Sequence, residues 1–168
     1  PGGILQDDGQ NLEIHNCEIY NWYWIAINLR NSTGANIHHN YIHNNQKPGA
    51  GYGVGNGWNA SSEIRYNIFN YNRHSIATNG DAVNNNLPSY TAEYNLVLPC
   101  ANGHRFDMHG YKDEYQNYPD MLASCNYWEP CNAAGEVMEI HNNTFITIPG
   151  VPNRYMVFIR AYPIREQT

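Results

Sequence analysis

A phrase of six residues recurs five times along the chain and constrains the fold more than any other feature. In each copy the first and sixth residues are small or apolar, and the fourth is asparagine in every copy but the first. The copies occupy residues 14–19, 37–42, 64–69, 92–97 and 140–145, so their starts lie 23, 27, 28 and 48 residues apart. A period of roughly 20–50 residues is typical of a solenoid, in which each repeat forms one structural unit.

The composition favours strands and turns over helices. The chain of 168 residues has 26 asparagines, 14 tyrosines and 14 glycines, but only two lysines, Lys47 and Lys112. Asparagine and β-branched residues are poor helix formers, and Gly or Pro interrupts nearly every interval between copies. We therefore predict one all-β domain over residues 1–168, interrupted by an insertion at 99–136.

A second strand-like segment follows each copy of the phrase, at 24–29, 51–55, 74–78, 105–109 and 155–160. Its side chains are expected to alternate between the core and the surface with a period of two. The inward set would be Ile25, Ile27, Tyr52, Val54, Ile76, Phe106, Met108, Val157 and Ile159. The outward set would be Ala26, Asn28, Gly53, Gly55, Ser75, Ala77, Arg105, Asp107, His109, Phe158 and Arg160.

The phrase and its spacing resemble the coils of right-handed parallel β-helix proteins, the pectate-lyase-like superfamily that includes NosD-like repeat proteins. The resemblance implies a right-handed parallel β-helix of about five coils over roughly residues 10–162. It also implies a ladder of stacked side chains at the fourth position, because an amide satisfies both kinds of backbone group that a tight bend leaves without partners. The ladder residues would be Cys17, Asn40, Asn67, Asn95 and Asn143, with Cys17 a buried free thiol.

The most site-like arrangement lies on the fourth of the second strands. Because Arg105, Asp107 and His109 alternate, we expect them to share one face, where a carboxylate beside a histidine orients it as a general base. Arg73 and His74 on the adjoining coil would complete a catalytic group, and an ordinary surface network of ion pairs is the alternative. The expected substrate contacts are Asn28, Asn79, Tyr111, Lys112 and Arg160.

The resemblance suggests what such a group would do. Polyuronate lyases of the superfamily use a basic residue to abstract the proton next to a carboxylate, often with calcium held by acidic side chains. It therefore implies polysaccharide as the partner, a lyase or hydrolase as the enzyme class and calcium as the cofactor, although no residue here matches a family signature. The competing class is a non-enzymatic structural or adhesive module, such as a filament or envelope subunit.

Histidines offer a second kind of chemistry. His15, His38 and His141 occupy equivalent positions in the phrase, and a row of imidazoles can hold a transition metal. Arg65 and Glu93 fill the same position between them, so His38 and His141 are not neighbours. Solvated histidines are therefore the better account, and no metal site is assigned.

The charge and the cysteines bear on partners and location. A formal charge of −6 with two lysines argues against nucleic acid, and no apolar run reaches the roughly 18–20 residues of a membrane span. The bulk composition and the sequons at Asn31, Asn59 and Asn142 favour an extracellular or cell-surface protein. One disulfide is expected among Cys100, Cys125 and Cys131.

The ends of the chain give one further expectation. The chain begins with Pro1 and Gly2 rather than methionine, which suggests a processed or excised piece of a larger protein. A solenoid also exposes strand edges at both ends unless they are capped. Self-association or a neighbouring domain is expected to cover them.

Overall fold

The fold consists of parallel strands arranged in three sheets, and the computed structural model describes residues 2–80, 86–99, 104–110, 135–148 and 155–159. The first sheet contains β1 (Ile4–Asp7), β4 (Ile25–Arg30), β7 (Tyr52–Gly57), β10 (His74–Gly80), β13 (Phe106–Gly110) and β16 (Val157–Ile159). The second contains β2 (Glu13–His15), β5 (Ala35–His38), β8 (Ser61–Arg65), β11 (Ser89–Glu93) and β14 (Met138–His141). The third contains β3 (Glu18–Tyr20), β6 (Tyr41–His43), β9 (Ile68–Asn70), β12 (Leu96–Val97) and β15 (Thr144–Phe145).

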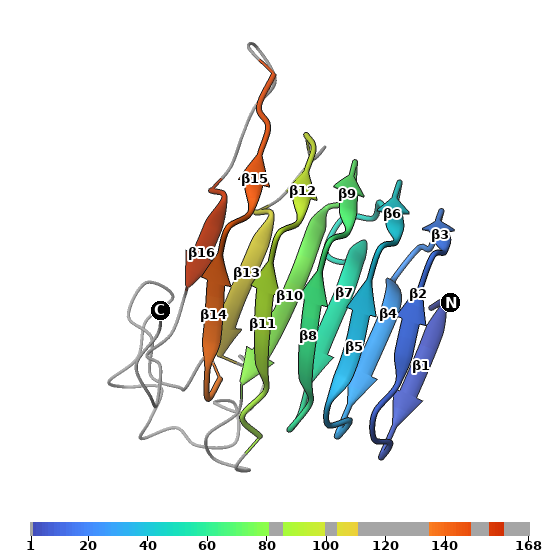
Figure 1. Ribbon diagram of the computed structural model, residues 1–168, viewed down its shortest axis with the longest axis vertical. Helices are drawn as coiled ribbons and strands as arrows, with labels where there is room; N and C mark the ends of the chain where they lie inside the picture. The colour runs from blue at the N-terminus through green and yellow to red at the C-terminus, as the bar shows by residue number, and fades with distance from the viewer. Residues whose placement is uncertain (1, 81–85, 100–103, 111–134, 149–154, 160–168) are drawn as a thin grey trace.

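The chain visits the three sheets in the same order each time, so each circuit forms one coil (Figure 1). Every strand pairs in parallel with its equivalent in the next coil, which places residues of successive coils in columns. Five complete coils stack in this way, and β16 begins a sixth. The prediction of a parallel β-helix of about five coils is confirmed.

The core fills the space enclosed by the three sheets. Its members include Ile27 and Val54 from the first sheet, Ile37 from the second, and Ile42 and Phe69 from the third. The first and sixth positions of the phrase supply the contributions of the second and third sheets. Burial of these columns provides the main stabilising free energy of the coil.

The predicted ladder lies at the corner between the second and third sheets, which we call the second corner. Asn67 Oδ1 accepts a hydrogen bond from Asn40 N at 3.0 Å, and Asn67 Nδ2 donates to Ile37 O at 2.8 Å. The same pattern runs from Asn40 through Asn67 and Asn95 to Asn143.

Cys17 departs from this pattern. Its backbone N donates to Asn40 Oδ1 at 3.0 Å, but its side chain is exposed rather than buried. It belongs to the first described coil, where no ladder residue of a preceding coil covers it. The expectation of a buried thiol is wrong.

The residue before each ladder position has a left-handed backbone. Asn16, His39, Tyr66, Tyr94 and Asn142 have φ angles of 54°, 54°, 55°, 53° and 56°. This conformation turns the chain outward at the second corner. The rings of His39, Tyr66 and Tyr94 consequently stack on one another, with centroids 5.2 Å apart in each pair.

The first sheet does not keep a simple alternation of faces. Ala26 and Ile27 are consecutive yet both fully buried in the core, and a β-carbon added to Gly53 would lie 3.2 Å from Ile42 in the third sheet. The N–H groups of Ser75 and Ile76 both donate to Arg105 O, as in a β-bulge. The residues in register with Ser75 face inward, contrary to the expectation for Ala26, Gly53 and Arg105. Ser75 was also expected to face outward, and it is 1% exposed.

A second, shorter ladder lies at the third corner, between the third and first sheets. Asn45 Oδ1 accepts from Trp22 N at 2.8 Å, and Asn72 Oδ1 accepts from Asn45 N at 3.2 Å. It anchors the segment that leads into the first sheet and carries the loop 46–51.

Candidate functional site

Arg105 is buried and bonded to the backbone rather than displayed at the surface. Its guanidinium Nη1 donates to Leu98 O at 3.3 Å and to Ile146 O at 3.2 Å, two carbonyls that follow strands of the third sheet. Only 2% of the residue is exposed. The expectation that Arg105 and Asp107 share a face is therefore wrong, because the bulge turns Arg105 inward.

Asp107 does lie on the outer side of the first sheet. Its neighbours Phe106 and Met108 are fully buried in the core, so the side chain between them points away from it. His74 on the preceding coil approaches it, with Nε2 at 3.7 Å from Asp107 Oδ2. The structure thus brings together two of the residues that the sequence analysis grouped.

The protonation state of His74 follows from its contacts. Nδ1 lies 2.6 Å from His104 O, and because a carbonyl only accepts, Nδ1 carries the hydrogen. Burial lowers the pKa of His74 to about 4, with Asp107 opposing the shift and Arg73 adding to it. At neutral pH the imidazole is uncharged, and its Nε2 lone pair faces the carboxylate.

A row of rings extends along this face from coil to coil. Tyr52 stacks on His74 at 5.3 Å, His74 on His104 at 5.7 Å, and His104 on Tyr155 at 5.5 Å between centroids. The ring centroids of His104 and Phe158 also lie 4.2 Å apart. Tyr52 was expected to face inward; the bulge places it in this outer row instead.

Two cations lie at the edge of the row, near the third corner. The Arg73 guanidinium lies 5.7 Å from the Tyr52 ring centroid, with Nη1 at 3.4 Å from the Tyr52 hydroxyl. Lys47 Nζ lies 4.3 Å from the Tyr23 ring centroid. Within the described part of the chain, neither cation has an acidic partner among the ion pairs.

The loop 46–51 holds these two cations in place. Lys47 forms a backbone bridge with Ala50, and Arg73 Nη1 contacts Ala50 O at 3.5 Å. Gly51 has a φ of 82°, and a β-carbon there would lie 2.7 Å from Asn45 O. Lys47 was not predicted to contact a ligand, and the glycine-rich run around Gly51 is the sequence feature that indicates an unusual backbone nearby.

The remaining predicted contacts are distributed along the same sheet. Asn28 and Asn79 are half-buried, and they pair in register with Gly55 and Gly57. His109 lies on β13 opposite Asn79, and its side chain is outside the described part. Tyr111, Lys112 and Arg160 also lie outside the described residues, as do Cys100, Cys125 and Cys131.

The second sheet carries the histidine row and a polar hollow. His15 and His38 stack with centroids 5.1 Å apart, whereas Arg65 and Glu93 separate His38 from His141. Among the described residues, no group of three or more His, Cys, Asp or Glu side chains is placed to hold a metal ion. A hollow of about 320 Å³ lies nearby, lined by polar residues that include Asn36, Ser61, Glu63, Ser89 and Thr91.

The sequon asparagines and several apolar side chains of the terminal coils lie at the surface. Asn31, Asn59 and Asn142 are all exposed. Apolar side chains are exposed on the terminal coils, including Leu5 at 57% and Ile148 at 48%. No helix long and apolar enough to cross a membrane occurs in the described ranges.

Comparison with known proteins agrees with this geometry. Searches of curated proteins and of solved structures find no match to the chain. The family model described as "right handed beta helix region" matches residues 1–95, more than half of the 168 residues. The matched part spans the first three coils and most of the fourth. The chain therefore belongs to the right-handed β-helix family.

Proposed function

We propose that this β-helix binds an extended, acidic polysaccharide along the outer side of its first sheet, beside the third corner. The observation that carries the proposal is the row of cations and rings beside the third corner, where Lys47 lies 4.3 Å from the Tyr23 ring centroid and Arg73 lies 5.7 Å from the Tyr52 ring centroid. The row crosses three successive coils and so runs along the helix axis. A polymer lying along the axis would meet the same columns coil after coil.

The chemistry of the edge favours an acidic polymer. Arg73 and Lys47 each combine a cation with a tyrosine ring, which suits a carboxylate and the apolar face of the same sugar. Beside them, the half-buried Asn28 and Asn79 offer amide groups along the same sheet. A neutral sugar would use the rings and amides but leave both cations unpaired.

Binding to a polygalacturonate-type polymer, measured by calorimetry against a neutral glucan, tests this proposal. Arg73→Met and Lys47→Met should each weaken binding at least about tenfold, the loss of a charge-assisted hydrogen bond of roughly 1.5–3 kcal/mol. Arg65→Met is the matched control, because Arg65 lies on the second sheet and pairs with Glu63 at 3.3 Å. Equal affinity for the neutral glucan, or an equal loss in the control, would contradict the proposal.

A catalytic role for the same row is the second candidate, favoured by the uncharged state of His74. An imidazole with an available Nε2 can take the proton next to a uronate carboxylate. His74 and Asp107 are only 2% and 1% exposed, so a sugar reaches Nε2 only if the groups covering it move. The test is the ultraviolet absorbance of the conjugated double bond left by elimination. It should appear with the wild type and be lost in His74→Asn while polymer binding persists.

The structural or adhesive class has its own supporting observation. The exposed Leu5 and Ile148 lie at opposite ends of the described stack, where the edge strands pair with no further strand among the described residues. Sedimentation analysis separates the classes: a glycan-binding module should stay monomeric without polymer, whereas a filament subunit should self-associate as its concentration rises. The exposed sequons at Asn31, Asn59 and Asn142 support the further proposal of an extracellular or cell-surface location.

A further inference from the structure

At the second corner, two consecutive side chains of a coil meet on the outside of the molecule. The second residue of each pair has a left-handed φ, which brings its side chain beside that of the preceding strand residue. In the first coil, Asn16 Nδ2 donates to His15 Nδ1 at 2.9 Å. In the fifth, Asn142 Nδ2 donates to His141 Nδ1 at 3.2 Å. The corner is therefore a repeated geometry filled by different residues.

In the second coil both positions are histidines. Their Nδ1 atoms form a hydrogen bond of 2.8 Å, in which one ring donates and the other accepts, although consecutive residues of a regular strand point to opposite faces. No other described coil has two nitrogen ligands at this pair of positions: the remaining pairs are His15–Asn16, Arg65–Tyr66, Glu93–Tyr94 and His141–Asn142.

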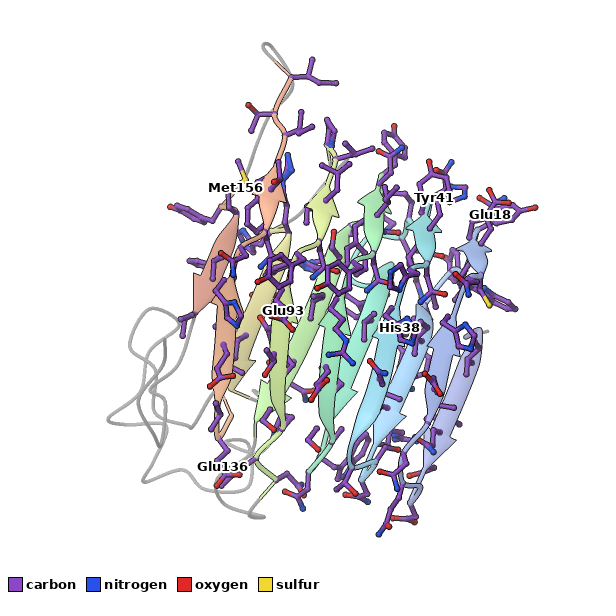
Figure 2. All side chains as sticks on the ribbon, in the orientation of Figure 1. Glu18, His38, Tyr41, Glu93, Glu136 and Met156 are labelled. Carbon is purple, nitrogen blue, oxygen red and sulfur yellow. The ribbon has the colours of Figure 1, made fainter. Side chains whose placement is uncertain are left out.

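The surroundings orient His38 as a ligand. Its Nε2 lies 3.0 Å from Glu13 Oε1, and the His15 ring stacks on it with an interplanar angle of 3°. A carboxylate bound to one ring nitrogen holds the hydrogen there and leaves the lone pair on the other, the arrangement found behind metal-binding histidines. Figure 2 shows the His38 side chain on β5, at the end of the strand that leads into the corner.

We propose that His38 and His39 form a two-histidine chelating site for a late first-row divalent metal ion, bound through their Nδ1 atoms. Two imidazole nitrogens at about 2.0–2.1 Å from one metal lie roughly 3.0–3.4 Å apart. The observed 2.8 Å therefore needs an opening of a few tenths of an ångström. His39 is exposed, so its ring can make that adjustment and its hydrogen can move from Nδ1 to Nε2 through water, which leaves both Nδ1 lone pairs for the metal. Water completes the coordination.

The site predicts an order of affinity. Two neutral imidazoles favour Cu²⁺ over Ni²⁺ and Zn²⁺, and they do not favour calcium, which prefers oxygen ligands. The site lies on the second sheet and second corner, away from the row of rings on the first sheet. The proposed metal site can therefore be tested independently of polysaccharide binding.

The test replaces His39 with the residue found at the same position in other coils. His39→Asn puts into the second coil the residue that the first and fifth coils use. It should keep the hydrogen bond to His38 Nδ1 and the left-handed backbone while removing one ligand. Calorimetry with Cu²⁺ alone should show one site in the wild type, with affinity at least about tenfold lower in His39→Asn. The circular dichroism spectrum should be unchanged, and the metal-free melting temperature should fall by only a few degrees, because the variant loses the ring contact between His39 and Tyr66.

Two more variants complete the design. Asn16→His adds a ligand instead of removing one, because it places a second histidine beside His15 at the φ of 54° that His39 also has. The number of bound Cu²⁺ ions should then rise from one to two. His141→Gln removes a histidine from the same column of a distant coil and should leave affinity unchanged. Absence of Cu²⁺ binding, or the same affinity in wild type and His39→Asn, would overturn the proposal.

Discussion

His74 Nε2 lies 3.7 Å from Asp107 Oδ2, with the two side chains 2% and 1% exposed, on adjacent coils of the first sheet. The pair sits on the outer side of the sheet yet is shielded from water. Rings of the same row, Tyr52 and His104, stack on the two faces of the imidazole. The contact joins the scaffold to the surface that we propose binds polymer.

Lowering the pH should weaken the fold through His74. Its folded pKa of about 4 is below the value of 6.5 expected in the unfolded chain, so the unfolded state binds the proton more readily. This contribution is fully present above about pH 6.5 and is lost as the pH falls toward 4, by at most roughly 3 kcal/mol. Asp107, Arg73 and His104 are the other ionisable groups that act on the ring.

Denaturant unfolding at pH 7.5, 5.5 and 4.5 checks this expectation, with His74→Asn as the comparison. The difference in unfolding free energy between the wild type and His74→Asn should become smaller as the pH falls, because only the wild type has an imidazole at position 74 to protonate. Parallel losses in both proteins would show that other groups govern the acid sensitivity.

Removing an amide from the middle of the ladder should be costly. Asn67→Ala deletes the acceptor of Asn40 N and the donor to Ile37 O, leaving buried backbone groups without partners. The expected loss is roughly 2–4 kcal/mol of unfolding free energy. Cys17→Ala, at the exposed end of the same ladder, should change stability by less than about 1 kcal/mol. Thermal melts of the two variants measure the difference directly, and similar melting temperatures would refute the ladder's role.

Arg105→Ala should act on folding rather than on binding alone. The change removes the donor to Leu98 O and Ile146 O and opens a cavity in the core, at a cost of about 2–4 kcal/mol. Arg65→Ala, at a half-exposed surface ion pair, should cost less than about 1 kcal/mol. If urea midpoints show Arg105→Ala as stable as wild type while polymer binding disappears, the arginine belongs to the binding surface instead.

Two glycines of β7 should respond oppositely to the same substitution. A β-carbon at Gly53 would lie 2.6 Å from Ser75 O and 3.2 Å from Ile42, so Gly53→Ala should destabilise by roughly 1–3 kcal/mol. At Gly57 the nearest atoms lie 3.8 Å away, so Gly57→Ala should be neutral or slightly stabilising. Melting temperatures of the two variants check the inward bend of the strand, which a harmless Gly53→Ala would contradict.

The fold was predictable because every coil has the same bend and needs the same kind of residue there. Asn40, Asn67, Asn95 and Asn143 recur at one bend, and their hydrogen bonds to backbone explain why asparagine is needed there. The candidate site was predictable only in part. His74 and Asp107 belong to neighbouring segments of the repeat and do meet.

The misassigned residues have a common physical cause. An uninterrupted alternation puts Arg105 outside and Tyr52 inside, whereas the bulge at Ser75 and Ile76 reverses the faces at the start of the strand. A bulge adds one residue to one strand of a hydrogen-bonded pair and leaves no pattern in the hydrophobicity of the sequence. The meeting of His38 and His39 was missed for a related reason, since it depends on the φ of 54° at His39. The asparagines at the same place in the first and fifth coils were the available hint.

The ladder also determines where this protein can accept new sequence. Successive ladder residues are separated by 23, 27, 28 and 48 positions, yet the bond between them stays at 3.0, 3.0, 2.9 and 2.9 Å. The surplus residues enter mainly between the first and second sheets: β4 ends at Arg30 and β5 begins at Ala35, whereas β13 ends at Gly110 and β14 begins at Met138. Peptides grafted at that corner should therefore leave the stack intact, so a lineage of such proteins can acquire new surfaces there without redesigning its scaffold.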